Sequence, residues 1–181
     1  MVAAAVLIAS AAACGDDPDP KVDSPPTPTP TISTSPASGP VAPTLPPEAE
    51  GDDAAAAEAF VEYFWAMVKY AETTGEVEAL EALVSPQCQG CAGGIEFLRR
   101  VFQNGGEIGG GDVTLSNFKV RELEGGPATL FEVRVDVIST RQVVSYPDEA
   151  DNQVFPAGTV TDRFMVLNHD GRWSMDRWEV L

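Results

Sequence analysis

Positive charge is scarce in this chain, which has 11 Lys and Arg residues against 28 Asp and Glu residues and a formal net charge of -17. Nucleic-acid binding needs a basic face that neutralises phosphates, so the composition excludes nucleic acid as an expected partner. An acidic surface is also repelled by anionic lipid headgroups. Attachment to a membrane would therefore have to come from acyl chains rather than from surface charge.

Residues that carry metal or acid–base chemistry are also few. The only histidine, His169, lies in the hairpin-turn motif 168–171, which predicts an exposed turn residue rather than a general base in a cleft. Structural zinc normally takes four ligands, and beside His169 the domain offers only Cys88 and Cys91. The glycine-rich run 105–111 lacks the Lys and Ser/Thr of a phosphate-binding loop. We therefore predict no catalytic residue, no metal and no cofactor, and the ligand-binding residues stay unassigned.

The apolar run at the N-terminus, Met1 to Ala13, is shorter than the roughly 20 residues that span a membrane. Its length is typical of a signal-peptide core, and a polar stretch follows Cys14. A cysteine at that junction resembles the lipid-modified cysteine of bacterial lipoproteins, which implies a diacylglyceryl anchor on Cys14 and a place on the extracytoplasmic side of the cell membrane. The run Ala11-Ala12-Ala13 also fits an ordinary cleavage site, so a secreted protein is the alternative.

A segment rich in Pro, Thr and Ser follows the leader. Residues 24–47 are too poor in large apolar side chains to offset the chain entropy lost on folding. Recurrent proline favours an extended polyproline II spacer, which could reach roughly 70 Å. The alternative is a peptide ligand for a domain that binds polyproline II. We predict a signal peptide over 1–13, a disordered tether over 14–50 and one domain over 51–181.

The first half of the domain is predicted to be helical. Apolar residues recur at steps of three and four, and Asp52 and Asp53 are the expected N-caps of the first helix. Gly75 and Pro86 separate the segments. The predicted helices cover residues 54–73, 76–84 and 92–104.

The second half reads as strands, because apolar and polar residues alternate. The apolar phase shifts between Leu115 and Phe118, which predicts a bulge. A proline-containing acidic loop is expected over residues 146–158. The predicted strands cover residues 113–123, 129–137, 159–167 and 172–180. This order predicts an α+β domain in which three N-terminal helices pack on a curved four-stranded antiparallel sheet.

Charged residues alternate with apolar ones along the second strand. Glu132, Arg134 and Asp136 share one face, which indicates a solvated outer face with cross-strand ion pairs. The alternative is the polar wall of a pocket.

Two segments carry a family resemblance. The run 74–86 and the ending 170–178, in this order of elements, are similar to the nuclear-transport-factor-two-like superfamily, which includes SnoaL-like and ketosteroid-isomerase-like proteins. Together with Cys88-Gln-Gly-Cys91 and the leader, the chain over 48–181 resembles a family of uncharacterised actinobacterial lipoproteins. The resemblance implies a cone-like fold and an envelope location, and that family has no assigned activity. Aromatic residues are expected mainly in the core, with some at the mouth of the cone: Phe60, Tyr63, Phe64, Trp65, Tyr70, Trp173 and Trp178.

Cys88 and Cys91 are expected to form a structural disulfide, the usual fate of a cysteine pair in an exported protein. The alternative is a redox-active pair, since Cys91 lies near a helix N-terminus, where a thiol pKa falls. A thioredoxin-like motif, however, follows a strand, whereas this pair lies between two helices.

The leading functional interpretation is a non-enzymatic, lipid-anchored extracytoplasmic domain that binds a protein or a small apolar ligand at the cell envelope. The alternative is an isomerase- or dehydratase-like enzyme that uses the cone cavity. Buried carboxylates, or an inward His, with a perturbed pKa would favour the enzyme. A cavity lined only by aliphatic and aromatic groups, or an exposed apolar sheet face, would favour binding.

Overall fold

A computed structural model describes residues 39–124 and 128–181, so the signal peptide, Cys14 and most of the tether lie outside the described residues. Within them, α-helices and a short 3-10 helix precede the strands. A second 3-10 helix lies between two strands, so the helical residues are not all N-terminal as expected. The elements are η1 (Pro47–Ala49), α1 (Ala54–Thr74), α2 (Glu78–Glu81), α3 (Gln89–Gln103), β1 (Glu107–Gly110), β2 (Val113–Leu123), β3 (Thr129–Ser139), β4 (Gln142–Ser145), η2 (Glu149–Asp151), β5 (Gln153–Phe155), β6 (Gly158–His169) and β7 (Arg172–Val180).

The helices start where side chains cap them. Asp53 caps α1, because its carboxylate accepts a hydrogen bond of 2.9 Å from the backbone N–H of Ala56. Helix α2 is a single turn, shorter than the predicted 76–84. Helix α3 begins at Gln89, before the predicted start at 92, because the sulfur of Cys88 accepts a hydrogen bond of 3.3 Å from the backbone N–H of Cys91.

The predicted four-stranded antiparallel sheet is present with the order β2-β3-β6-β7. Its register shifts between Ser116 and Lys119, and Asn117 between them has a φ of 57°, which confirms the predicted bulge. The hairpin of β6 and β7 turns at Asp170 and Gly171, both with positive φ.

A second sheet, which the sequence analysis did not predict, has the order β1-β4-β5. Strands β1 and β2, β3 and β4, and β5 and β6 are consecutive in the chain, and a bend separates the two members of each pair. The order β1-β4-β5 in one sheet therefore matches the order β2-β3-β6 in the other. The predicted single four-stranded sheet was therefore wrong in the number of strands. The loop expected over 146–158 was wrong as well, since it contains η2 and β5.

Two glycines shape this bend. Gly110 and Gly111 have φ values of 72° and 70°, in the left-handed region. A Cβ on Gly110 would collide with the carbonyl oxygen of Arg141. Two backbone hydrogen bonds join the neighbouring chain segments at the bend. The N–H of Gly111 donates to the carbonyl oxygen of Arg141 at 3.2 Å, and the N–H of Thr140 donates to the carbonyl oxygen of Asp112 at 2.9 Å. A side chain at Gly110 would therefore push these two chain segments apart.

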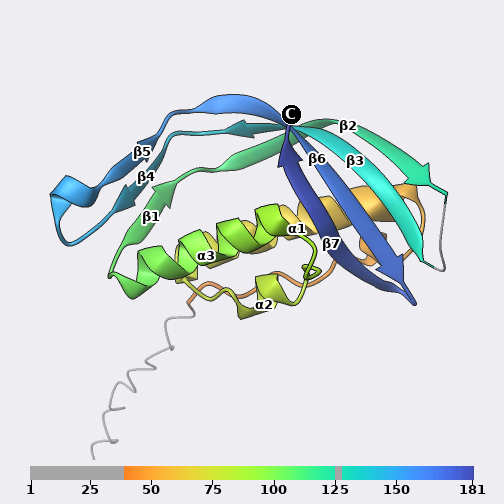
Figure 1. Cartoon of the computed structure of the whole chain (residues 1–181), viewed down its shortest axis with the longest axis horizontal. Coiled ribbons are helices and arrows are strands. Elements are labelled where there is room, and N and C mark those ends of the chain that lie inside the picture. The colour runs from red at the N-terminus through yellow and green to blue at the C-terminus, as the bar shows by residue number, and fades with distance from the viewer. Residues whose placement is uncertain (1–38, 125–127) are drawn as a thin grey trace, which may run out of the picture. The chain divides into compact units, whose positions relative to one another are not determined.

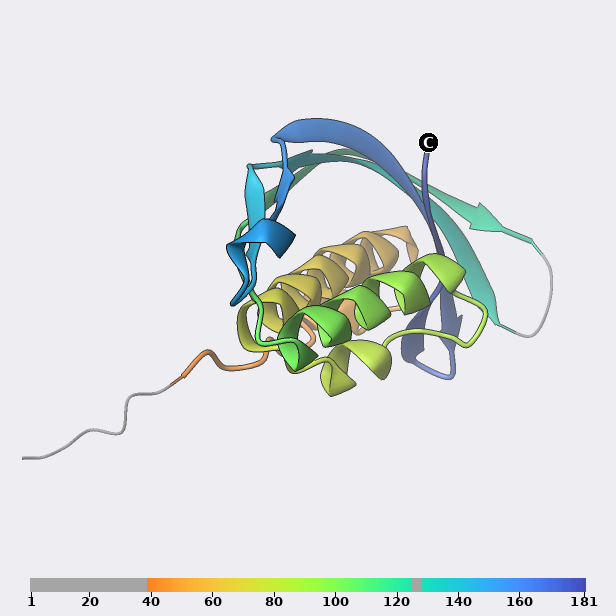
Figure 2. The same cartoon turned by 60° about the vertical axis from the view of Figure 1, so that its left-hand side comes forward.

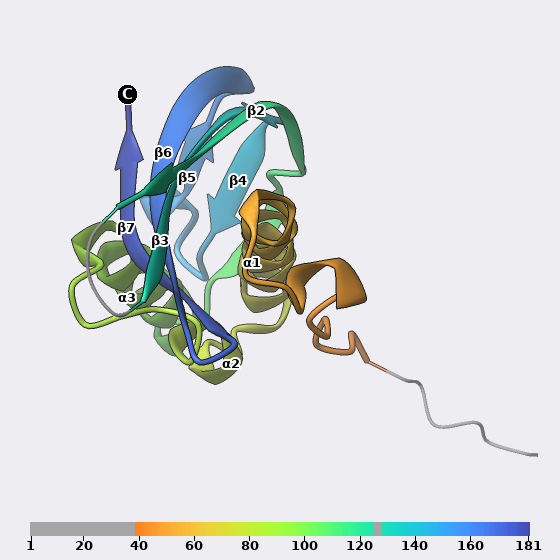
Figure 3. The ribbon, with the colours of Figure 1, turned by 90° about the vertical axis from the view of Figure 1, so that its right-hand side faces the viewer.

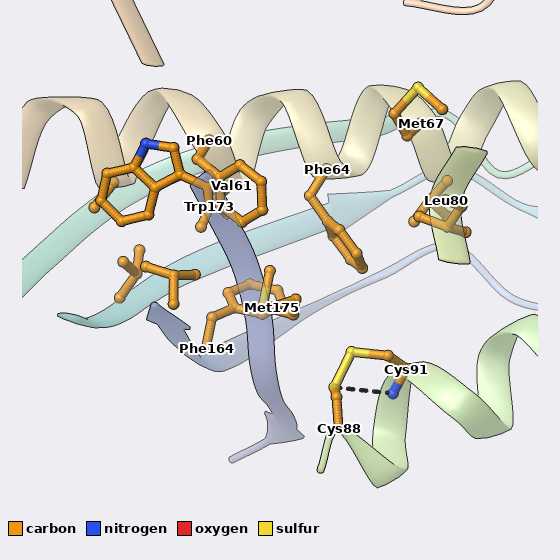
Figure 4. Close-up of a cluster of buried hydrophobic side chains, with 14 of the residues drawn as sticks. Phe60, Val61, Phe64, Met67, Leu80, Cys88, Cys91, Phe164, Trp173 and Met175 are labelled. Carbon is orange, nitrogen blue, oxygen red and sulfur yellow. Dashed lines mark hydrogen bonds between the residues drawn. A yellow bond between two sulfur atoms is a disulfide. The ribbon is translucent and has the colours of Figure 1, made fainter. Parts of the chain in front are cut away.

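The bent sheets arch over helices α1 and α3, which lie beneath their concave side (Figures 1 and 2). Seen from the side, the two helices run next to each other under the arch (Figure 3). The core forms between them and the inner face of the sheet, where Phe60 stacks on Trp173 with ring centroids 5.7 Å apart (Figure 4). The inward residues of β3 are Phe131, Val133, Val135 and Val137.

The outer face of β3 carries the charges. Glu132 pairs with Arg121 across the strands at 3.3 Å and with Arg134 at 3.1 Å. Asp136 accepts hydrogen bonds from Asn117 and from Thr161. These contacts confirm the interpretation of a solvated outer face rather than a pocket wall.

The segment before α1 docks on the hairpin of β6 and β7. Ala49 is fully buried, and its carbonyl oxygen accepts a hydrogen bond of 2.8 Å from the indole N–H of Trp173. The side-chain amide of Asn168 donates to the carbonyl oxygen of Gly51 at 3.2 Å. Contacts of the folded domain therefore begin before residue 51, the boundary expected from the sequence.

These contacts predict different results for two truncations. A chain that begins at Ala37 keeps them, so it should unfold with the same free energy as the longer chain. A chain that begins at Asp52 leaves the buried Trp173 indole N–H without its acceptor, which should cost about 1–3 kcal/mol. Urea unfolding of both chains checks this expectation. Equal stability of the two would show that the segment contributes nothing to the fold.

Candidate functional site

The described residues form a cavity, open on one side, between the helices and the concave side of the sheets. Its volume is about 440 Å³, in the range of small-molecule sites. Residues of α1, α2 and α3 form one wall, and residues of both sheets form the other. The lining residues are Phe64, Trp65, Val68, Glu72, Leu80, Cys91, Gly94, Ile95, Phe97, Leu98, Gly111, Val113, Val137, Ser139, Thr140, Gln142, Phe155, Pro156, Val160, Asp162, Trp178 and Val180.

Asp162 on β6 is the most unusual residue of this lining. It is 1% exposed, and its Oδ2 accepts a hydrogen bond of 2.9 Å from the indole N–H of Trp178. Its Oδ1 is buried without a hydrogen-bond partner. Burial raises the pKa of this carboxyl from 3.8 to about 6, and the hydrogen bond from Trp178 opposes that rise. The hydrogen-bonding capacity of this oxygen is therefore unmet within the described residues.

The sequence analysis missed Asp162, although a signal was present. Val160, Asp162, Phe164 and Val166 occupy alternate positions of β6, and the last three of these are buried. A charged residue in the inward phase of a strand is rare in a core and marks a candidate functional site. The alternation of apolar residues in this strand is visible in the sequence, and Asp162 is the charged residue that interrupts its inward phase.

Glu72 on α1 is the second carboxyl in the lining. It continues the stripe of Phe64 and Val68 at four-residue steps, so it faces the cavity from the last part of the helix. Its Oε1 accepts a hydrogen bond of 2.9 Å from the side-chain amide of Gln142. Burial raises the pKa of Glu72, while this hydrogen bond and the nearby charge of Lys69 oppose the rise.

Aromatic rings pack around Trp178, whose indole N–H donates to the Asp162 carboxyl. Trp178 packs edge-on against Trp65, with ring centroids 5.2 Å apart, and against Phe64 at 6.2 Å. Trp65 Nε1 is also buried without a partner, so both unpartnered buried polar side-chain atoms among the described residues belong to the cavity lining. The aromatic residues divide as expected. Phe64, Trp65 and Trp178 line the cavity, whereas Phe60 and Trp173 pack in the core.

The histidine and the cysteines that the sequence analysis singled out are not gathered at this cavity. His169 lies in the turn between β6 and β7, with 62% of its side chain exposed, and contacts Asp170. Cys88 and Cys91 form a disulfide with Cα atoms 5.3 Å apart (Figure 4), and both residues are buried. Of His169, Cys88 and Cys91, only Cys91 lines the cavity. Cys14 lies outside the described residues.

Two further features of the described residues bear on function. Within 39–124 and 128–181, no three His, Cys, Asp or Glu side chains gather closely enough to hold a metal ion. Helices of sufficient length and hydrophobicity to cross a membrane are likewise missing from this part of the chain.

The raised pKa of Asp162 predicts how stability depends on pH. The folded state holds this proton more tightly than the unfolded state, so the contribution of Asp162 to the stability of the wild-type protein should fall as the pH rises from about 4 to about 6 and remain level above that. Asp162→Asn removes this loss but keeps Glu72. The free energy of unfolding of the variant, relative to wild type, should therefore increase across that interval. Urea unfolding at a series of pH values measures it, and a constant difference would contradict the raised pKa.

Comparisons with solved structures place the fold in a wider context. The intermembrane space region of the chloroplast protein ARC6 is similar, with a TM-score of 0.52, 19% sequence identity, and coverage of 71% of this chain and 96% of that chain. At that identity, the similarity shows a shared fold alone. A candidate scytalone dehydratase from Novosphingobium aromaticivorans (TM-score 0.43, 19% identity, 69% of this chain and 83% of that chain) and a protein named Rd1NTF2_05 (0.39, 12%, 70% and 96%) are more distant, and neither carries a functional argument.

Comparison with curated proteins finds no match. A family model does match, and it covers the last part of the expected tether together with nearly the whole folded domain. The match agrees with the expectation of a family without an assigned activity. The chain belongs to the family of unknown function DUF6318, whose model matches residues 27–180.

Proposed function

We propose that this protein binds a small, mostly apolar molecule in the cavity beneath the bent sheets, as an extracytoplasmic protein anchored through Cys14. One observation carries the binding proposal: an apolar cavity of about 440 Å³ is lined by a buried carboxyl group, one oxygen of which has no hydrogen-bond partner. Apolar walls supply affinity and the few polar groups fix orientation, as in most small-molecule sites.

The composition of the lining supports this proposal. Aliphatic and aromatic side chains predominate, and the polar groups are confined to few positions, among them Glu72, Gln142 and Asp162. A core that had evolved only for stability would not place an unpartnered carboxylate among aromatic rings, because such a group costs free energy. A ligand that interacts with this carboxylate would offset that free-energy cost.

The proposed location rests on the leader and the tether. A lipid on Cys14 would hold the chain at the membrane, and the Pro/Thr/Ser-rich segment would separate the domain from the surface. The domain would then meet ligands in the envelope without inserting into the bilayer. Its acidic charge agrees with attachment through acyl chains rather than through headgroups.

A proton-transfer enzyme is the second candidate, and Asp162 is the observation that favours it. A buried carboxyl with a pKa of about 6 at the wall of a cavity can accept a proton from a bound substrate near neutral pH. Among the described residues, however, its only hydrogen-bond partner is Trp178. Chemical conversion of a bound compound, lost in Asp162→Asn while binding persists, would favour the enzyme over the binding protein.

The cavity can be filled from one helix position, with a matched control beside it. Gly94 lines the cavity, and a Cβ there would meet only the Trp178 ring, at 3.9 Å. Gly93 is exposed, and a Cβ there meets nothing within 4 Å. Gly94→Leu should therefore weaken binding of the neutral fluorescent probe N-phenylnaphthylamine by roughly tenfold or more, whereas Gly93→Leu should leave it unchanged.

Fluorescence titration of purified protein measures both affinities, and thermal melts establish that both variants are folded. Both substitutions replace a helical glycine by leucine, so they share the same gain in helix propensity. Equal probe affinity in the two variants would place binding outside the cavity. Absence of any binding to the wild type would remove the support for an apolar ligand site.

The anchoring proposal has its own test. Metabolic labelling of the producing cells with a clickable fatty acid should label the wild-type protein and leave Cys14→Ser unlabelled, because the thioether of a lipoprotein anchor requires the cysteine sulfur. Cell fractionation should find the wild type with membranes and the variant in the medium. Release of both proteins into the medium would instead support simple secretion.

A further inference from the structure

The charge of the cavity lining has one sign. Glu72 and Asp162 are its only ionisable side chains, and none of the described lining residues is a Lys, Arg, His or Tyr. Cys91 is tied in the disulfide. The cavity is therefore an apolar chamber with two carboxyl groups and no positive charge of its own.

The two carboxyls differ in what surrounds them. Glu72 receives a hydrogen bond from Gln142 and lies near the charge of Lys69, which itself binds Asp112 at 3.0 Å. Asp162 has only the neutral indole N–H of Trp178 on one oxygen. A buried carboxylate without a counter-charge is costly, so Asp162 is the place where a positive group from outside would gain most.

Aromatic rings complete the surroundings of such a group. Trp178 donates to Asp162 and packs against Trp65 and Phe64, and all three residues line the cavity. The faces of aromatic rings attract cations, and carboxylates beside aromatic rings form a common setting for ammonium groups. Neutral polar ligands would use the hydrogen bond but not this second attraction.

We propose that the cavity binds an organic cation, an apolar body that carries an ammonium group, with that group placed against Asp162. This inference rests on the proposed function and specifies its ligand class. The positive charge of the ammonium lies against the Asp162 carboxyl, which has no counter-charge, and the apolar body occupies the aliphatic and aromatic part of the cavity. Hydrocarbons, alcohols and anions of the same shape bind more weakly.

Binding of the cation should depend on pH. Protonation of Asp162 removes the charge that the ammonium needs, so affinity falls as the pH drops through about 6. The other titratable group facing the cavity is Glu72 from α1, whose raised pKa acts in the same direction. Among the described lining residues, α2, α3 and the remaining strands contribute no titratable side chain apart from the disulfide-bonded Cys91.

Three probes of one shape test the proposal: phenylbutylamine, phenylbutanol and phenylbutyrate. Each is titrated against the full chain carrying Cys14→Ser, so that no lipid or detergent is present, by displacement of bound N-phenylnaphthylamine. The amine should bind roughly ten- to a hundredfold more tightly than the alcohol, as hydrogen bonds to charged groups do, and the carboxylate should bind most weakly. Asp162→Asn should reduce the affinity for the amine to that for the alcohol.

A matched surface variant distinguishes binding at Asp162 from non-specific attraction of an amine to an acidic protein. Glu122→Gln removes one exposed charge far from the lining and should leave the amine affinity unchanged. If Asp162→Asn does not fold, the ranking of the three probes on the wild type and the fall in amine affinity below pH 6 still decide the question. Displacement of the dye by alcohol and amine with equal affinity would overturn the cation proposal while the cavity remains a binding site. Failure of the dye itself to bind would instead overturn the proposed function.

Discussion

The bend that divides three strands into two sheets is the constraint on which the site depends. It is possible because Gly110 and Gly111 adopt positive φ values and because the backbone at Arg141 approaches so closely that a side chain at Gly110 would collide with it. Beyond the bend, β1, β4 and β5 curve over α3 and carry Gln142 and Phe155 to the cavity lining (Figure 2). A flat continuation of the same strands would not bring these residues to the lining.

The carboxyl of Asp162 is the second feature around which the interior is organised. Its position in the inward phase of β6 gives it the same orientation as Phe164 and Val166, which are fully buried. Burial without a counter-charge raises its pKa, and Trp178 satisfies only one of its oxygens. Such a residue lowers the stability of the empty protein above about pH 6, and that cost is typical of positions kept for binding or chemistry.

The disulfide links this interior to the helix that covers it. Cys88 caps α3 and Cys91 lines the cavity one turn further along, so the bridge holds the start of the helix against the chamber. Its two residues are at most 2% exposed, in contrast to the accessible sulfur of a redox catalyst. The aromatic packing of Trp178 on Trp65 and Phe64 joins the sheet wall to the helical wall.

The sequence by itself determined the features that depend on neighbouring residues. The period of apolar residues in α1, the capping of that helix by Asp53 and the turn at Asp170 and Gly171 are local, so they could be predicted. The bulge in β2 followed from a change of phase within one strand. The outward charges of β3 followed from simple alternation, because Glu132 and its partners occupy the phase opposite to the buried valines.

Only the tertiary structure decided where the cavity is and what it contains. The second sheet arises from pairing between short segments such as β1 and β4, whose residues are far apart in the chain and whose own patterns are too short to read. Alternation shows which side of a strand faces inward, but it does not show whether a neighbouring side chain fills the space there. Asp162 and Glu72 become a site because the bend leaves that space empty, and this depends on the close approach of Gly110 to Arg141 across 31 positions of sequence.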